Sequence, residues 1–292
     1  MEQKKLNRAY KGIILIILSA LCFALMGVFV RLAGDLPSIQ KSFFRNIVAL
    51  FFSAAVLIKS KEKPELSKKS LKYLFLRAAF GTIGLICNFY ALDKLVLADA
   101  SILNKMSPFF AIIASYFVLK EKISPTKIII VAVAFTGSLF VIKPSFQNAQ
   151  LLPSVIGLLG GLGAGIAYTM VRKLGTMGIK GPFIVFFFSA FSSLTVLPFM
   201  IADFKPMSKI QILYLLLAGL CATGGQFTIT SAYIYAPARN ISIYDYSQII
   251  FTSVLGFLIF GQIPDILSIT GYILIVSMAV IMFLINKKSP KA

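Results

Sequence analysis

The chain has 292 residues, a formal net charge of +19 at pH 7 and no histidine, and 58% of its residues are hydrophobic. Its mean hydropathy of +0.89 excludes an ordinary soluble domain, because a soluble core cannot bury so many apolar segments. The three cysteines stand singly, so their spacing indicates neither a metal site nor a disulfide framework. We therefore expect no cofactor and no enzymatic activity.

Ten apolar segments follow one another along the chain, and each is long enough to cross a membrane. A helix rises about 1.5 Å per residue, so about 20 residues cross a hydrocarbon layer of about 30 Å. The predicted fold is therefore an all-α polytopic membrane protein with ten transmembrane helices. We expect these helices over 12–30, 38–58, 73–92, 98–119, 125–142, 153–171, 182–201, 210–235, 241–261 and 265–285.

The second five segments repeat the first five after a shift of 141 residues. Val30-Arg31 then matches Val171-Arg172, and Gly84 matches Gly225. Because each half has an odd number of spans, the second half must enter the membrane from the opposite side. We predict two inverted five-helix repeats, 1–142 and 153–292, joined by a linker at 143–152. Inverted repeats typically place a substrate site near the membrane midplane and work by alternating access.

The positive charge is distributed unevenly across the predicted membrane. Twenty of the 29 Lys and Arg residues fall on the side of the two termini, and six fall on the other side. This bias predicts that both termini are cytoplasmic and that the linker at 143–152 is external, in a bacterial cell membrane. The charge then indicates topology and contact with anionic lipid, and we expect no nucleic-acid partner.

The chain resembles the drug/metabolite transporter superfamily, in its ten-helix EamA family. The residues that carry the resemblance are Phe44-Arg45, Arg77, 88–92, 108–110, 119–122, Tyr168, 171–174 and 260–264. Members usually carry Glu where Gln262 stands. The resemblance implies transport, mostly by export or exchange, of amino acids, nucleotide derivatives, vitamins, drugs or quaternary amines.

The chain has no G-x-x-x-x-G-K-[ST] loop, so we expect secondary transport without ATP binding of that kind. Protons are one candidate for the coupling ion, and exchange of substrates is another. A channel or scramblase is the other class considered, but the spans are too apolar for a continuous polar stripe. The sequence is compatible with a monomer or a dimer.

Two charged residues are candidates for the substrate site. Lys105 lies roughly 10 Å into its span, where a charge must be paired, hydrated or extended toward the surface. It either plays one of these structural roles or binds a carboxylate or phosphate of the substrate. Asp245 either caps its helix through the pattern S-x-x-D from Ser242, or carries a proton or binds an ammonium group. Asn104 and Lys105 are equivalent to Asp245 and Tyr246 in the repeat, so we expect these residues to face one another across a central cavity.

Polar and aromatic residues of other spans are predicted to line the same cavity. They are Tyr168, Asn88, Gln226, Tyr244 and Tyr246. Pro108 either frees a carbonyl for binding or only bends its helix. Arg45 and Arg77 are predicted to anchor lipid headgroups or loops, with contact to the substrate as the alternative. The glycines of 157–165 are predicted to serve close helix packing, with a thin cavity wall as the alternative.

Three substrate classes remain open at this point. For an amino acid or related zwitterion, Lys105 would bind the carboxylate and Asp245 the ammonium group. An organic anion or nucleotide-like metabolite is favoured by three cations against one acid within the spans. A cationic drug or quaternary amine would use the aromatic side chains together with Asp245.

Overall fold

The computed structural model describes residues 2–60, 66–118, 123–143, 149–235 and 242–288, and the regular structure of these residues is entirely helical. The helices of the first half are α1 (Glu2–Leu32), α2 (Ser38–Ser60), α3 (Lys68–Lys94), α4 (Leu97–Asn104), α5 (Ser107–Val118) and α6 (Pro125–Ile142). Those of the second half are α7 (Leu151–Thr176), α8 (Gly181–Ala202), α9 (Lys209–Tyr235), the 3₁₀ helix η1 (Ser242–Tyr246), α11 (Ser247–Phe260) and α12 (Ile266–Lys288).

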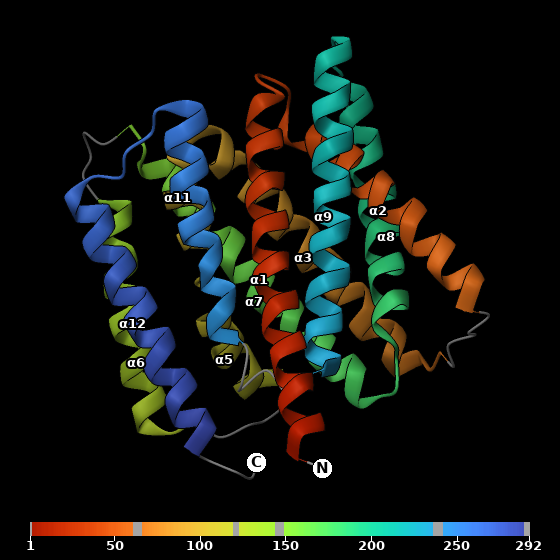
Figure 1. The fold of residues 1–292 in the computed structure, drawn as a ribbon. Coiled ribbons are helices and arrows are strands. Elements are labelled where there is room, and N and C mark those ends of the chain that lie inside the picture. The colour runs from red at the N-terminus through yellow and green to blue at the C-terminus, as the bar shows by residue number, and fades with distance from the viewer. Residues whose placement is uncertain (1, 61–65, 119–122, 144–148, 236–241, 289–292) are drawn as a thin grey trace.

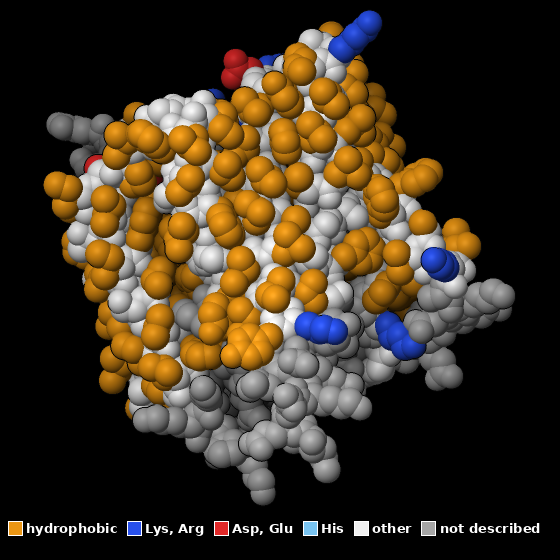
Figure 2. Space-filling view, viewed as in Figure 1, with side chains coloured by type: hydrophobic (Ala, Val, Ile, Leu, Met, Phe, Trp, Pro, Cys, Tyr) orange, Lys and Arg blue, Asp and Glu red, His pale blue; other side chains and the backbone are white. Residues whose placement is uncertain are grey.

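The described helices are long and apolar enough for a polytopic membrane protein. Nine spans meet this criterion among the described residues, with α4 and α5 counted together as Leu97–Val118. A shorter apolar segment, Tyr244–Phe260, supplies the remaining predicted span. Hydrophobic side chains are spread over the described part of the face seen in Figure 2, as expected of a surface in contact with lipid tails. The predicted all-helical membrane fold is confirmed.

The helices pack in a pattern that is nearly unchanged when the two halves are exchanged. α3 packs along α7, and the equivalent pair in the repeat, α9 and α1, packs in the same way. α2 packs on its own equivalent α8, and α6 on its equivalent α12. In Figure 1, α1 begins and α12 ends at one edge, while α6 ends and α7 begins at the opposite edge. This is the arrangement of two inverted repeats. Which edge is cytoplasmic stays a prediction, and residues 144–148 of the predicted linker lie outside the described residues.

Two spans that the sequence predicts as continuous α-helices, 98–119 and 241–261, depart from α-helical structure at equivalent positions, which we call the helix breaks. α4 ends at Asn104 and α5 begins at Ser107, whereas in the second span the five-residue 3₁₀ helix η1 runs directly into α11. Pro108 explains the first break, because proline has no N–H to donate to the carbonyl four residues earlier. Residues 119 and 241 lie outside the described residues.

The two breaks contact each other directly. The Tyr246 hydroxyl donates a hydrogen bond of 3.0 Å to the carbonyl oxygen of Lys105, and these two residues are equivalent in the repeat. A carbonyl freed by a helix break needs such a partner, since lipid supplies none. The broken spans therefore meet where the halves of the molecule meet.

The glycines of α7 allow this helix to approach both α3 and the broken span. A Cβ atom at Gly163 would lie 2.9 Å from the Cα of Gly84 in α3. At Gly161 and Gly165 it would lie 2.6 Å from backbone carbonyl oxygens beside the α4–α5 break. The prediction of close helix packing through small residues is confirmed.

Candidate functional site

A cavity of about 110 Å³ lies between the two halves at the level of the helix breaks. Helices of both repeats line it, from α1 and α2 of the first to α9 and η1 of the second. Five of the seven side chains that the sequence predicts for the substrate site are among the lining residues. They are Lys105, Asp245, Tyr168, Asn88 and Gln226.

One end of the cavity is formed by an ion pair that joins the two broken spans. The Lys105 ammonium lies 2.5 Å from Oδ2 of Asp245, and the side chains are 9% and 17% exposed. Lys105 therefore pairs across the halves and does not extend to the membrane surface. Oδ1 of Asp245 is buried without a hydrogen-bond partner among the described residues. This carboxylate oxygen can therefore accept a hydrogen bond from one further donor, such as an ammonium group.

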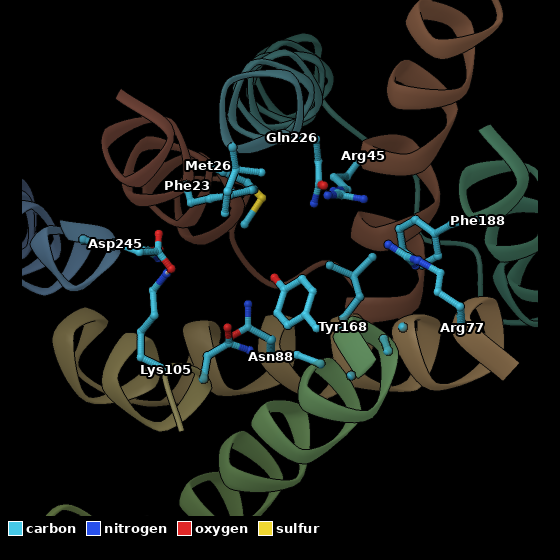
Figure 3. A pocket seen from close by; sticks show the side chains of 18 residues that line it. Phe23, Met26, Arg45, Arg77, Asn88, Lys105, Tyr168, Phe188, Gln226 and Asp245 are labelled. Carbon is cyan, nitrogen blue, oxygen red and sulfur yellow. The ribbon is translucent and has the colours of Figure 1, made fainter. Parts of the chain in front are cut away.

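Polar side chains from three helices lie between the ends of the cavity. Figure 3 shows Tyr168 of α7 in the middle, with Asn88 of α3 beside it and Gln226 of α9 opposite. Tyr168 is 47% exposed although it projects into the interior, so the cavity around its ring is open space. These groups offer hydrogen-bond donors and acceptors along a path from one charged end to the other.

The other two predicted residues, Tyr244 and Tyr246, are not among the lining residues. Successive side chains of a 3₁₀ helix point about 120° apart. When Asp245 points into the cavity, its two neighbours must therefore point elsewhere. Tyr246 is buried and supports the backbone of Lys105 through its hydroxyl, while Tyr244 is exposed.

Two arginines that the sequence suggests as anchors form the opposite end of the cavity. Arg45 of α2 and Arg77 of α3 are only 4% and 6% exposed, and both line the cavity. The sequence predicts Arg77 as an anchor because it lies only four residues into the apolar run that begins at Tyr73. In the structure its side chain is directed into the cavity and not toward the end of the helix. A charge inside an apolar run is costly unless it is paired or functional, and this is the signal that could have identified Arg77.

Both guanidinium groups face the ring of Phe188 in α8. The Cζ atom of Arg77 is 3.8 Å from the ring centroid, and that of Arg45 is 5.8 Å away. The ionisable lining groups are Arg45, Arg77, Lys105 and Asp245, apart from a tyrosine. The cavity thus carries three positive charges and one negative charge. Coulomb interactions are stronger in such a poorly hydrated interior than in water, so this excess attracts anionic groups.

Polar contacts join the two halves at the edge where α6 passes to α7. Oε1 of Gln262 accepts a hydrogen bond of 2.9 Å from the backbone N–H of Leu97, at the start of α4. Gln262 thus supplies an acceptor oxygen here, as the Glu expected from the family resemblance would. At the same edge Lys143 pairs with Asp265. Slight desolvation acts to raise the pKa of Asp265, but hydrogen bonds from Lys143 and a backbone N–H hold it below its usual value.

No three His, Cys, Asp or Glu side chains gather as a metal site requires, within the part of the chain that the structure describes. The cavity therefore offers charged side chains, amides and a phenol as its binding groups.

Sequence comparison now identifies the family to which this fold and cavity belong. The model of the EamA-like transporter family matches residues 10–143 and 152–284, so the chain is a member of that family. The chain is 32% identical over 267 residues to the pseudopaline exporter CntI of Pseudomonas aeruginosa, covering 91% of this chain and 93% of that protein. It is 25% identical over 280 residues to human solute carrier family 35 member G1, covering 91% and 77%.

Two further comparisons agree with this assignment. The chain is 25% identical over 266 residues to a riboflavin transporter of Rhizobium johnstonii, with 88% and 86% covered. One protein crystal structure matches 96% of this chain and 99% of its own with a TM-score of 0.65. At 13% identity, that structure supports the fold alone. The three relatives described here are named as an exporter, a solute carrier and a transporter, and the chain is a multi-pass membrane protein of the EamA-like transporter family.

Proposed function

We propose that this protein is a secondary active transporter that moves a small polar metabolite across the plasma membrane by alternating access. The observation that carries the proposal is the central cavity, which has charged side chains from both repeats and lies where two broken spans meet. Transporters built from inverted repeats bind their substrates at this kind of position, next to interrupted helices.

The arrangement suggests how the two repeats exchange roles. Gln262 and the pair of Lys143 with Asp265 hold the halves together at one edge. In alternating access these contacts break as one repeat rocks against the other, and the cavity opens toward that edge. The central contact of Tyr246 with Lys105 relates equivalent residues, so it is a suitable pivot. We expect this edge to be the external one, because the charge bias predicts cytoplasmic termini.

The substrate class that the cavity favours is an amino acid or related zwitterionic compound that carries a further acidic group. A substrate carboxylate can replace Asp245 as the partner of Lys105, and the released aspartate can accept the substrate ammonium group. The excess positive charge of the cavity supports an organic anion as the second candidate. It disfavours a cationic drug or quaternary amine, which would be repelled by three cations.

Coupling to protons or to a counter-substrate follows from the same ion pair. A proton on Asp245 would remove the negative charge that holds Lys105, leaving the ammonium group available for an anionic substrate. A substrate that arrives from the other side would separate the pair in the same way. The exporter name of the pseudopaline relative supports outward movement of the substrate.

Counterflow in liposomes tests this proposal. Purified protein is reconstituted without ATP, and liposomes loaded with an unlabelled metabolite are offered the same metabolite in labelled form. A thermal-shift screen against amino acids, organic acids, nucleotides and quaternary amines selects the metabolites, because ligands of the folded state raise its melting temperature. We expect saturable counterflow without nucleotide. A requirement for ATP, or flux that does not saturate, would contradict secondary transport.

A further inference from the structure

Two buried arginines at one end of the cavity have donors that no group of the described chain uses. Nε of Arg45, and Nε and Nη1 of Arg77, are buried without a hydrogen-bond partner among the described residues. Within the part of the chain that the structure describes, the ion pairs are Lys41 with Asp93 and the two pairs reported above. Neither arginine therefore has a described carboxylate within 4.0 Å. Burying such a charge is costly unless a partner arrives.

The surroundings hold both guanidinium groups in place. The Phe188 ring lies against them, and its negative face attracts both cations. Nη1 of Arg45 donates to Oδ1 of Asn46 at 2.6 Å, and the Asn46 amide donates to Ser192 at 2.7 Å. This chain of bonds fixes Arg45 and leaves its Nε available.

Gly81 makes room for the second arginine. A Cβ atom at this position would lie 2.6 Å from Nη1 of Arg77 and 3.1 Å from the Phe188 ring. Any larger residue would therefore push the guanidinium group from its place. An arginine that only anchored the helix at the membrane surface would need neither this space nor this burial.

We propose that Arg45 and Arg77 form a second anion subsite, which binds a carboxylate or phosphate group of the transported molecule. A guanidinium group presents paired N–H donors that match the two oxygens of such a group. Two of them would share one oxyanion, which also relieves their mutual repulsion. The inference rests on the proposed function, because it takes the central cavity to be the substrate site.

The position of the subsite defines the class of substrate. Figure 3 shows the Arg77–Phe188 group and the Lys105–Asp245 pair at opposite ends of the cavity, with Tyr168 between them. A ligand that reaches both ends has a zwitterionic amino-acid group at Lys105 and Asp245, and a further acidic group at the arginines. The substrate class is therefore an amino-acid-like metabolite with more acidic than basic groups.

Thermal stability of the full-length protein in the presence of simple anions tests the subsite. The probes are inorganic phosphate and citrate, and the variants are Arg45→Gln, Arg77→Gln and Arg77→Lys. Arg31→Gln is the matched control, because Arg31 also lies over a phenylalanine ring, that of Phe260, but outside the cavity. We expect both anions to raise the melting temperature of the wild type and of the control. Either Gln variant should need at least tenfold more anion than the wild type for the same rise in melting temperature.

The melting temperature without anions separates a binding role from a structural one. An unpaired buried charge destabilises the empty protein, so Arg77→Gln should leave its melting temperature unchanged or raise it. Arg77→Lys keeps the charge without the paired donors, and should retain only part of the anion response. An equal anion response in wild type and Gln variants, or lost folding in all three variants, would overturn the subsite.

The source of the anion is tested with a matched pair of ligands, L-glutamate and L-glutamine, which differ in one acidic group. We expect the wild type to bind glutamate at least tenfold more tightly, and Arg77→Gln to lose this preference. A phosphate response with no preference for glutamate would assign the subsite to a free anion and contradict the substrate class. Absence of any counterflow in liposomes, with the anion response intact, would instead reject the proposed transport function alone.

Discussion

The two ends of the central cavity handle the same problem, a buried charge, in different ways. At one end Lys105 and Asp245 neutralise each other across the two repeats. At the other end Arg45 and Arg77 lie side by side against one aromatic ring, and no described acid pairs with them. A balanced pair can persist without substrate and can open when one partner is protonated or replaced. An unbalanced pair of cations gains most when an anion arrives, because the empty site carries the full cost of their burial.

The largest effect is expected from Lys105→Met, which keeps most of the stem and removes the charge. It should abolish or strongly weaken transport. It also leaves Asp245 buried without its partner. Breaking a fully buried pair in this way lowers the free energy of unfolding by about 3–5 kcal/mol. We expect a smaller loss here, because the Asp245 carboxylate is partly exposed. Transport in liposomes and the melting temperature check both effects.

A second substitution controls for this loss of stability. Lys105→Met combined with Asp245→Asn removes both charges, so it should recover much of the stability but none of the transport. A Lys105→Met variant with a normal transport rate and unchanged affinity would limit Lys105 to a structural role. Failure of both variants to insert would favour a structural ion pair over a substrate contact.

Phe188→Leu tests the other end of the cavity with a smaller expected effect. The substitution removes the aromatic face from both arginines while keeping an apolar side chain. A cation–π contact contributes about 0.5–2 kcal/mol, so the affinity for an acidic ligand should fall by up to roughly thirtyfold as the guanidinium groups lose their orientation. Isothermal titration with the ligand selected by the thermal-shift screen measures this change. Phe199→Leu, at an exposed position of the same helix, is the control and should bind normally.

Tyr246→Phe tests whether the contact between the two breaks orients Lys105. The variant loses one hydrogen bond to a buried carbonyl, which costs about 1 kcal/mol, or somewhat more because the acceptor is left without a partner. We expect a small drop in melting temperature and a larger loss in transport rate than in substrate affinity. The reverse result, lost affinity at a normal rate, would indicate that the tyrosine contacts substrate itself.

The smallest effect is expected at the exposed pair of Lys143 with Asp265. The pKa of Asp265 is held below its unfolded value, so its stabilising effect is present above the unfolded pKa and is lost as the pH falls through the folded pKa. Because the aspartate is largely exposed, Asp265→Asn should cost less than about 1 kcal/mol. Melting temperatures of wild type and variant should converge on acidification toward pH 3. A gap that stays constant with pH would contradict an ionic origin.

Periodicity and symmetry in the sequence were sufficient for most of the fold. Apolar length predicts the spans, and the shift of 141 residues places Lys105 and Asp245 at neighbouring equivalent positions. The helix breaks were harder to predict, because apolar length is the same for a broken and an unbroken span. Pro108 indicated a bend in one span, but no proline marks the other.

The differences between prediction and structure have a common cause in local geometry. Arg77 lies near the end of the apolar run, but its side chain is directed into the cavity. The sequence predicts Tyr244 as a lining residue, although a 3₁₀ helix directs its side chain away from that of Asp245. Side-chain direction depends on the exact helix type and start, and composition alone fixes neither.

The central claim is that the cavity between the repeats is the substrate site and that both of its charged ends bind substrate. Counterflow of the screened metabolite in liposomes without ATP, measured for wild type, Lys105→Met, Arg77→Gln and Arg31→Gln, tests it most directly. We predict saturable counterflow for wild type and Arg31→Gln. Lys105→Met and Arg77→Gln should show at least tenfold lower counterflow at equal amounts of folded protein. Equal counterflow by all four proteins would show that the substrate passes elsewhere and would contradict the account.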